Sequence, residues 1–134
     1  MERMEDKICL DTDFLVNFLR NSEKEVEFIK ENEIKTELAT TYINIFELYY
    51  GAYKSERRDE NLKLINQLMK RIGLINLSND SAEIAGKISA MLEKQGLLVE
   101  FRDLLIGAMA LVNGYAIKTK NTKHFKNIKE LKLL

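Results

Sequence analysis

The sequence predicts an α/β fold built on a mainly parallel β-sheet with helices on both faces. Short apolar segments of strand length alternate along the chain with longer segments of helical periodicity. Parallel strands need crossover connections, and the helical segments between the strand candidates can supply them. The 134 residues contain no proline, no Gly/Ser-rich linker and no internal repeat, so we expect one continuous domain over residues 1–134.

The first third of the chain indicates two strands and two helices. Residues 7–10 form a short apolar strand candidate, and residues 35–39 form the second. A helix is expected over about residues 13–20. Another helix begins at Ser22, which has the spacing of a capping box with Glu25.

The rest of the chain continues the alternation of helices and strands. Four helical patterns follow, and a glycine ends each of the last two, as is common at helix C-termini. They span residues 42–54, 57–71, 80–95 (before Gly96) and 101–113 (before Gly114). The remaining strand candidates are residues 74–77, 115–119 and 131–134.

The charge balance does not by itself indicate a nucleic-acid partner. Lys plus Arg number 21 and Asp plus Glu number 21, so the formal net charge is zero. The segment 115–134 is locally basic, with six lysines against one acid, Glu130. Two interpretations of this segment stay open: a solvated surface, and a surface that partly contacts phosphates.

Cysteine content and hydropathy predict a soluble, cytoplasmic protein. The single cysteine, Cys9, lies in an apolar run and cannot form an internal disulfide, so we expect a buried hydrophobic role in a reducing compartment. The longest apolar stretch, residues 104–112, is well short of the roughly 18 residues that a membrane span requires. The N-terminus lacks the profile of a signal peptide.

Two aspartates are expected at the rim where an open α/β sheet builds its binding site. Asp11 immediately follows the first strand candidate, and Asp103 lies in the first turn of the most apolar helix. Each has an ordinary alternative explanation, because an aspartate at a helix start caps N–H groups or complements the helix dipole. For Asp103, an ion pair with neighbouring Arg102 is a further alternative. The coincidence of two such acids weakens these explanations.

A glutamate and an asparagine extend this group of polar residues. Glu47 interrupts the apolar run 42–50, where an ionised side chain is costly to bury without a cation or donor. Its partner is expected to be either a basic side chain or a metal ion shared with the other acids. Asn121 follows the strand candidate 115–119 at the same rim, although asparagine is also common in turns.

Taken together, these residues favour a divalent-metal site. Clustered carboxylates repel one another unless a cation compensates them. Oxygen ligands without a histidine cluster select Mg²⁺, Mn²⁺ or Ca²⁺ over Zn²⁺. Mg²⁺ also binds substrate phosphate and activates water, which suits phosphodiester hydrolysis.

Four short motifs stand in order along nearly the whole chain. They are Leu10-Asp11-Thr12-Asp13-Phe14-Leu15, Glu47-Leu48 with Gly51, Arg102-Asp103-Leu104-Leu105-Ile106-Gly107-Ala108, and Thr119-Lys120-Asn121 followed by Phe125. In their order and separation they resemble the four motifs of PIN domains, and in particular those of the VapC toxins of bacterial and archaeal toxin–antitoxin pairs.

The resemblance implies a three-layer α/β/α fold and an Mg²⁺- or Mn²⁺-dependent endoribonuclease. By position, Asp11 and Asp103 match the family's metal-binding aspartates, and Glu47 matches its catalytic acid, which we also expect at the metal. Asn121 falls where many members carry a fourth aspartate, so its role as a water positioner, a donor to the ligands or neither stays open. Two further acids lie near these motifs, Asp13 and Glu100, and whether either adds charge to the site stays open.

Residues 42–53 are apolar around nearly the whole circumference of the expected helix, so burial on more than one side is expected. Its tyrosines suit a recognition surface, and the resemblance implies both a homodimer and a VapB-type antitoxin partner. A charge at Tyr49 or Tyr53 is then expected to disturb association before catalysis. Core packing alone is the alternative.

Three functions other than RNA cleavage are compatible with parts of the sequence. A haloacid-dehalogenase-like phosphatase also opens with a strand followed by two aspartates, but Leu15 stands where that family has Thr or Val, and the late acidic pair is missing. A receiver-like signalling domain leaves Glu47 and Asp103 unexplained. A PIN fold that binds a partner without catalysis stays open because of Asn121.

Overall fold

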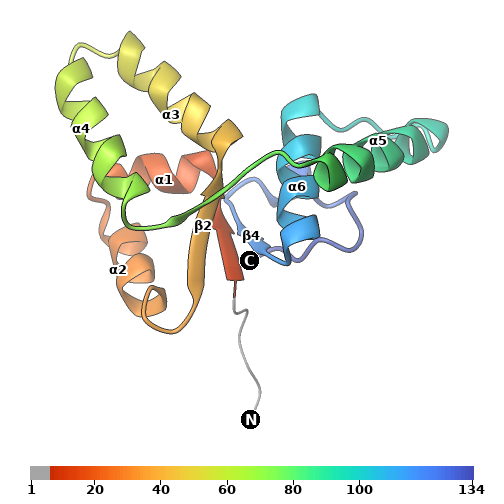
Figure 1. Cartoon of the computed structure of the whole chain (residues 1–134), viewed down its shortest axis with the longest axis horizontal. Helices are drawn as coiled ribbons and strands as arrows, with labels where there is room; N and C mark the ends of the chain where they lie inside the picture. The colour runs from red at the N-terminus through yellow and green to blue at the C-terminus, as the bar shows by residue number, and fades with distance from the viewer. Residues whose placement is uncertain (1–6) are drawn as a thin grey trace.

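A four-stranded parallel sheet lies at the centre of the computed structural model, which describes residues 7–134 (Figure 1). The strand order is β3-β2-β1-β4, and each neighbouring pair is parallel. The strands are β1 (Lys7–Leu10), β2 (Glu37–Thr41), β3 (Gly73–Ile75) and β4 (Ala116–Lys118). β1 and β2 are buried on both faces, which explains why their sequences lack the polar alternation of a one-sided sheet.

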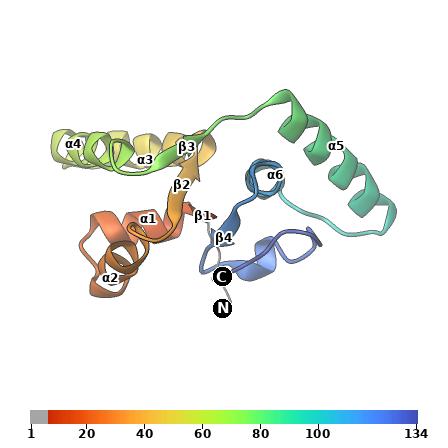
Figure 2. The ribbon, with the colours of Figure 1, turned by 60° about the horizontal axis from the view of Figure 1, so that its bottom comes forward.

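Helices cover both faces of the sheet and confirm the predicted three-layer α/β/α fold. In Figure 2, α1 to α4 lie on one side of the strands, whereas α6 and then α5 lie on the other. The helices described within residues 7–134 are α1 (Thr12–Leu19), α2 (Glu23–Asn32), α3 (Tyr42–Lys54), α4 (Arg58–Met69), α5 (Asn79–Lys94), α6 (Phe101–Asn113) and the 3-10 turn η1 (Thr122–His124). Over the same residues, no helix has both the length and the apolar character of a membrane span.

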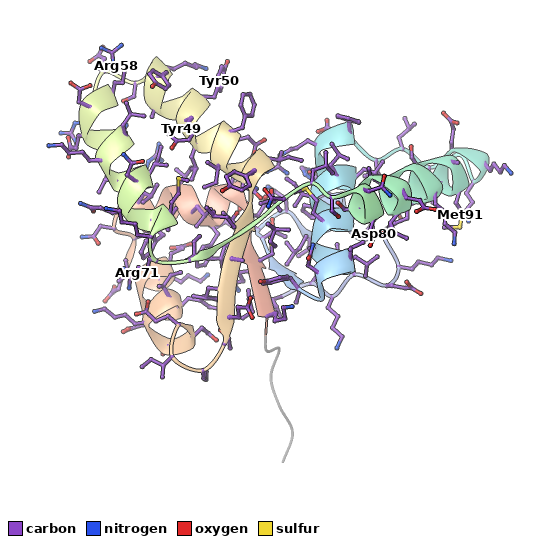
Figure 3. The ribbon with its side chains drawn as sticks, in the orientation of Figure 1. Tyr49, Tyr50, Arg58, Arg71, Asp80 and Met91 are labelled. Atoms are coloured by element: carbon purple, nitrogen blue, oxygen red, sulfur yellow. The ribbon has the colours of Figure 1, made fainter. Side chains whose placement is uncertain are left out.

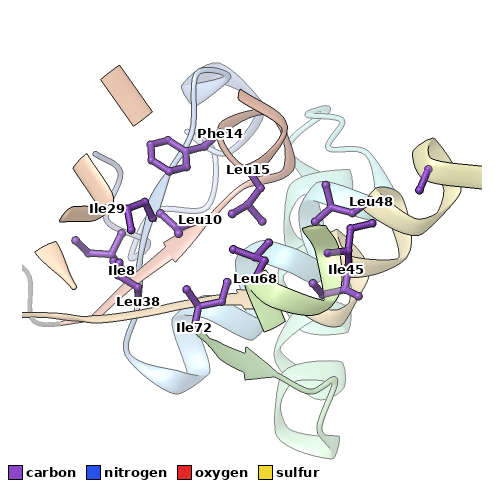
Figure 4. Close-up of a cluster of buried hydrophobic side chains, with 12 residues drawn as sticks. Ile8, Leu10, Phe14, Leu15, Ile29, Leu38, Ile45, Leu48, Leu68 and Ile72 are labelled. Atoms are coloured by element: carbon purple, nitrogen blue, oxygen red, sulfur yellow. The ribbon is translucent and has the colours of Figure 1, made fainter. Parts of the chain in front are cut away.

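The two faces of the sheet build separate hydrophobic clusters, because successive side chains of a strand point to opposite sides. Ile8 and Leu10 of β1 pack with residues of α1 to α4 in the cluster of Figure 4. Cys9 and Ala39 point the other way, into the cluster formed with α6 and the C-terminal segment. Burial, together with the charge of Asp11, raises the pKa of the Cys9 thiol, so it is the buried hydrophobic residue that was predicted.

The second strand begins later in the chain than its apolar pattern predicts. The N–H groups of Lys35 and Thr36 donate to the carbonyl oxygen of Asn32, at 3.2 Å and 2.8 Å, and thereby complete the turn after α2. These two residues are therefore unavailable to the sheet, and β2 starts at Glu37.

The C-terminal segment lies along the outer side of β4 but does not form the full strand predicted for residues 131–134. A single parallel bridge joins Leu133 to Ile117. The N–H group of Ile117 donates to the carbonyl of Lys132 at 2.9 Å, and that of Leu134 donates to the carbonyl of Ile117 at 2.8 Å. The segment thus satisfies backbone groups at an edge of the sheet.

Capping boxes fix the start of two helices. At α3, Thr41 Oγ1 accepts the N–H of Asn44, and at α5, Ser78 Oγ accepts the N–H of Ser81 at 3.1 Å. The capping box predicted at Ser22 is wrong, because its side chain makes no cap hydrogen bond. Its proposed partner Glu25 is buried instead and faces other side chains, Asn17 and Lys120.

The Ser78 cap should contribute measurably to stability. Ser78→Ala is expected to lower the free energy of unfolding by about 1 kcal/mol, because the N–H of Ser81 loses its acceptor. Ser22→Ala is the matched control, since Ser22 occupies the same position of α2 without a cap bond, and its effect should stay within about 0.5 kcal/mol. Urea unfolding followed by circular dichroism measures both variants, and equal losses would contradict a specific role for the Ser78 hydroxyl.

Candidate functional site

The candidate site lies at the carboxyl ends of β1 and β4, where the chain passes into α1 and toward η1. Asp11 directly follows β1, and its N–H donates to the carbonyl of Lys118 at the end of β4 at 3.0 Å. Asp11 is the residue before α1, yet its side chain makes no cap hydrogen bond with that helix. The carboxylate is almost fully buried, at 2% exposure. Its position is therefore not explained by helix capping.

The other two predicted acids reach the same place from two other helices. Asp103 lies in the first turn of α6 and is 2% exposed, and Glu47 comes from the middle of α3. Both carboxylates share a hydrogen-bonding partner with Asp11, namely the side chain of Arg102. The structure thus brings together the three acids that the sequence analysis assigned to the metal.

The guanidinium group of Arg102 stands between the three carboxylates. Its Nε donates to Glu47 Oε2 at 2.6 Å, and its Nη2 donates to Glu47 Oε1 at 2.8 Å. The same Nη2 lies 2.9 Å from Asp11 Oδ1, and Nη1 lies 2.6 Å from Asp103 Oδ1. Each nitrogen of the planar fork therefore meets at least one carboxylate oxygen, as a bidentate arginine geometry allows.

Electrostatics around Arg102 hold it firmly in the charged form. Burial alone lowers the pKa of the guanidinium, but the hydrogen bond with Glu47, the charge of Asp11 and the hydrogen bonds with Asp103 and Asp11 outweigh it, so the pKa lies above its ordinary value. The side chain keeps 29% exposure and so reaches solvent. One positive charge faces three carboxylates at this place.

Two neutral side chains, Asn44 and Thr119, orient the carboxylate of Asp11 through hydrogen bonds. Asn44 Nδ2 donates to Asp11 Oδ1 at 3.0 Å, and Thr119 Oγ1 donates to Asp11 Oδ2 at 2.8 Å. Asn44 Nδ2 also donates to Thr12 Oγ1 at 2.8 Å, and Thr12 Oγ1 in turn donates to Glu47. Hydrogen bonds therefore fix the positions of both oxygens of Asp11, so its carboxylate is a preorganised acceptor.

Asn44 was not predicted as a site residue, although the sequence pattern of α3 points to it. Asn44 interrupts the apolar run of α3 one helical turn before Glu47, so both polar side chains lie on one side of the helix. Asn44 is fully buried; its Nδ2 donates to Asp11, and its Oδ1 accepts from Thr41 Oγ1 in the capping box. One residue therefore joins the start of α3 to Asp11.

The side chain of Asn121 points to an acid outside the three-carboxylate group. Its Nδ2 donates to Asp13 Oδ2 at 3.1 Å, while its backbone N–H donates to Thr119 Oγ1 at 3.0 Å. Asn121 thus contacts Asp11 only indirectly, through Thr119. The remaining predicted acid, Glu100, is exposed at the N-terminal end of α6, and its side chain makes no cap hydrogen bond.

A histidine, His124, also lies beside the site. His124 Nδ1 lies 3.6 Å from Asp103 Oδ2, the oxygen that faces away from Arg102. The side chain of His124 is 47% exposed, so this neighbour of the buried Asp103 reaches solvent. His124 was not predicted as a site residue, because it is the last residue of η1 and only the fold brings it near Asp103.

The donor set suits a hard divalent cation, but its present arrangement is organised around Arg102. Carboxylate oxygens are the ligands that Mg²⁺ and Mn²⁺ prefer. Two of the carboxylates are buried and need a compensating cation. Across residues 7–134, however, no three acidic, histidine or cysteine side chains lie close enough together to hold a metal ion between them.

Comparisons with known proteins agree on one family. Residues 8–131 match the PIN domain. The chain is 31% identical over 123 residues to the tRNA(fMet)-specific endonuclease VapC of Shigella flexneri, covering 91% of this chain and 92% of that protein. It is 29% identical over 122 residues to ribonuclease VapC2 of Haemophilus influenzae, with the same coverage of 91% and 92%.

Solved structures give the same result for the fold. The chain superposes with a TM-score of 0.88 and 26% identity on a crystal structure of VapBC2 from Rickettsia felis bound to a DNA fragment from their promoter, covering 96% of this chain and 97% of that one. It also superposes with a TM-score of 0.86 and 26% identity on DNA-bound VapBC from Salmonella typhimurium, with 98% of each chain covered.

The hydroxyl of Thr119 should stabilise the protein through its bond to Asp11. Thr119→Val keeps the shape of the side chain and removes a buried donor to a carboxylate, so we expect a loss of about 1.5–3 kcal/mol in the free energy of unfolding. Thr122→Val changes an exposed threonine nearby and should cost less than about 0.5 kcal/mol. Guanidinium denaturation compares them, and a Thr119→Val loss no larger than that of Thr122→Val would refute the stabilising bond.

Proposed function

The chain belongs to the PIN-domain family, and from this premise we propose that it is a metal-dependent endoribonuclease and the toxin of a VapBC-type toxin–antitoxin pair. The relatives named ribonuclease and endonuclease VapC support RNA hydrolysis as the reaction. The single observation that carries the proposal is the convergence of Asp11, Glu47 and Asp103 from three separate elements on one place. Burying two of those carboxylates is costly unless a cation binds to them and compensates their charge.

Asp11, Glu47 and Asp103 would hold Mg²⁺ or Mn²⁺ through their carboxylate oxygens. The bound ion supplies charge that stabilises the phosphodiester oxygens and lowers the pKa of a water molecule. The chain's own contribution is to fix the directions of these oxygens, and Asn44 and Thr119 do so for Asp11.

The basic C-terminal segment would help to hold the RNA backbone. Lys123 and Lys126 are exposed, and His124 between them lies beside Asp103. Lysines at such a position attract phosphates without reading the base sequence. Lys120 differs from these lysines, because its Nζ lies 3.7 Å from the buried Glu25 carboxylate.

A groove next to the site would receive a segment of a VapB-type antitoxin. The groove has a volume of about 220 Å³ and lies between α1, α3 and α4. Val16, Leu48 and Leu64 give it an apolar lining, and Glu47 also lines it. An occupant of this groove would therefore lie beside an acid of the candidate site, where it can obstruct RNA. The solved VapBC complexes support a partner of this kind.

A second surface would join two copies of the chain. Four aromatic side chains of α3, which we call the aromatic stripe, follow one another at helical spacing and are 43–64% exposed. They are Tyr42, Phe46, Tyr50 and Tyr53. The rings of Phe46 and Tyr50 stack with their centroids 6.3 Å apart, and Tyr50 lies at the outer side of α3 in Figure 3. The helix is thus buried on one side only, unlike the expectation from its composition.

Tyr49 does not belong to the aromatic stripe, although the sequence analysis paired it with Tyr53. Its ring packs against the α1–α4 cluster, and its hydroxyl donates to Met69 Sδ at 3.5 Å. A charge at Tyr49 would damage the core as well as any interface. Tyr50 and Tyr53 are therefore the informative positions.

The carboxylates should be essential for cleavage. Asp11→Asn and Asp103→Asn are each expected to lower Mg²⁺-supported cleavage of purified RNA at least about 100-fold, because each keeps the shape and removes the charge that holds the ion. Cleavage by the wild-type protein should stop in EDTA. Gel electrophoresis of end-labelled RNA measures the rates at a temperature where all variants are folded.

Asp80→Asn is the matched control for the carboxylate variants, because Asp80 also lies in the first turn of a helix, α5, but is exposed and outside the site (Figure 3). It should cleave RNA at the wild-type rate. Wild-type rates in Asp11→Asn or Asp103→Asn, or full cleavage in EDTA, would overturn the metal-dependent mechanism. No cleavage of any RNA by the wild-type protein would favour the partner-binding alternative.

The aromatic stripe should control the size of the assembly. Tyr50→Glu and Tyr53→Glu are expected to convert a dimer into a monomer, because they place charge in an apolar contact. Multi-angle light scattering measures the mass, and RNA cleavage per chain reports whether the site is intact. Asp59→Lys, an exposed change on neighbouring α4, serves as the control. An unchanged mass in both tyrosine variants would assign the stripe no role in self-association.

A further inference from the structure

Arg102 fills the place at which the three acids converge. All three nitrogen positions of its guanidinium donate to carboxylates: Nε and Nη2 to Glu47, Nη2 to Asp11 and Nη1 to Asp103. Asp103 is the neighbour of Arg102 on α6, whereas Glu47 comes from α3 and Asp11 from the end of β1, so the contact joins three separate elements. The arginine acts as the shared counter-ion of the site.

One arginine does not balance this group of acids. Three carboxylates carry three negative charges and Arg102 carries one positive charge, so two negative charges remain uncompensated. The ordinary role of an arginine in a buried ion pair is to neutralise its partner, and here that role is incomplete. A divalent cation in the place of Arg102 would compensate one more of these negative charges than the arginine does.

The guanidinium and a metal ion compete for the same carboxylate oxygens. Asp11 Oδ1, Asp103 Oδ1 and both oxygens of Glu47 are all hydrogen-bonded to Arg102. With Arg102 between them, no three acidic side chains of residues 7–134 are close enough to ligate one ion. An ion can gain these ligands only when the guanidinium leaves them and the carboxylates move closer together.

The surroundings of Arg102 allow such a movement without loss of the site. Its side chain is 29% exposed and stands in the first turn of α6, next to the exposed Phe101, so a path to solvent exists. Asp11 also accepts hydrogen bonds from Asn44 and Thr119, and neither bond involves Arg102. A long arginine side chain can change rotamer while its helix stays in place.

We propose that Arg102 is a displaceable internal cation, which occupies the metal position of the metal-free protein and must leave the carboxylates before a divalent ion binds. The inference rests on the proposed metal-dependent function and adds a competitor for the metal that belongs to the chain itself. The buried carboxylates are then paired with a cation in both states. Arg102 thereby sets the metal concentration at which the site is half-occupied.

Removing the competitor should tighten metal binding in the absence of RNA. Isothermal titration with Mn²⁺ is expected to show about tenfold or greater tightening of the Kd for Arg102→Gln, because the ion no longer displaces hydrogen bonds to a charged group. Without metal, Arg102→Gln should melt at a lower temperature than the wild type, and Mn²⁺ should raise its Tm by more than it raises that of the wild type.

Arg71→Gln is the matched control. Arg71 also forms a bidentate pair, with Glu33 at 3.0 Å and 3.2 Å, but it lies after α4 and far from α6 (Figure 3). It should bind Mn²⁺ with the wild-type Kd. If Arg102→Gln binds Mn²⁺ as the wild type does, or more weakly, the competition is refuted while wild-type binding still supports the proposed function. If neither protein binds millimolar Mn²⁺, both proposals fail.

A measurement on the unaltered protein keeps the test decisive if Arg102→Gln does not fold. The Nε–H group of Arg102 should give a protected signal in a ¹H–¹⁵N NMR spectrum of the metal-free protein, because it donates to Glu47 at 2.6 Å. Saturating Mg²⁺ should shift this signal and remove its protection from solvent exchange, whereas the Arg71 signal should stay unchanged. An Arg102 signal that stays protected at saturating Mg²⁺ would overturn the proposal.

Discussion

The cost of buried negative charge governs the organisation of this protein. Asp11 and Asp103 are almost inaccessible to water, and together with Glu47 they would repel one another if nothing lay between them. Arg102 reduces that cost, and the amide of Asn44 and the hydroxyl of Thr119, which donate to Asp11, reduce it further. The parallel sheet makes this concentration of charge feasible, because its strands deliver residues to one rim while the hydrophobic clusters below hold the rim in place.

The rim joins the two halves of the molecule, which lie on opposite faces of the sheet. α1 to α4 supply Glu47, the groove and the aromatic stripe, whereas α6 and the C-terminal segment supply Asp103 and the basic side chains. The groove and the aromatic stripe therefore share α3 with Glu47, whereas Asp103 comes from the other half. A partner bound in the proposed groove between α1, α3 and α4 would contact Glu47 directly, which would couple partner binding to the acid site without a conformational relay.

The fold class and the three acids could be predicted because they follow from local patterns: apolar runs of strand length, and carboxylates at strand ends and helix starts. The pairing of Asp103 with Arg102 was among the alternatives drawn from the sequence. The contacts of Arg102 with Asp11 and Glu47 could not be predicted, since a long flexible side chain reaches other elements only after they have packed. The sequence spacing at Ser22 suggested a capping box, but burial of Glu25 beside Lys120 outweighed that local preference. The exposure of Tyr50 likewise depended on which side of α3 the core occupies.

The segment that runs beside β4 has a consequence for handling the protein. Strand edges with open N–H and C=O groups are templates for unwanted pairing between chains. On the β4 side, the backbone groups of Ile117 are occupied by Lys132 and Leu134, and β3 at the other edge is only three residues long. Cutting the chain before Lys132, or fusing a bulky tag that pulls these residues away, would open a hydrophobic edge to intermolecular sheet formation. A tag is therefore safer when a flexible spacer separates it from Leu134.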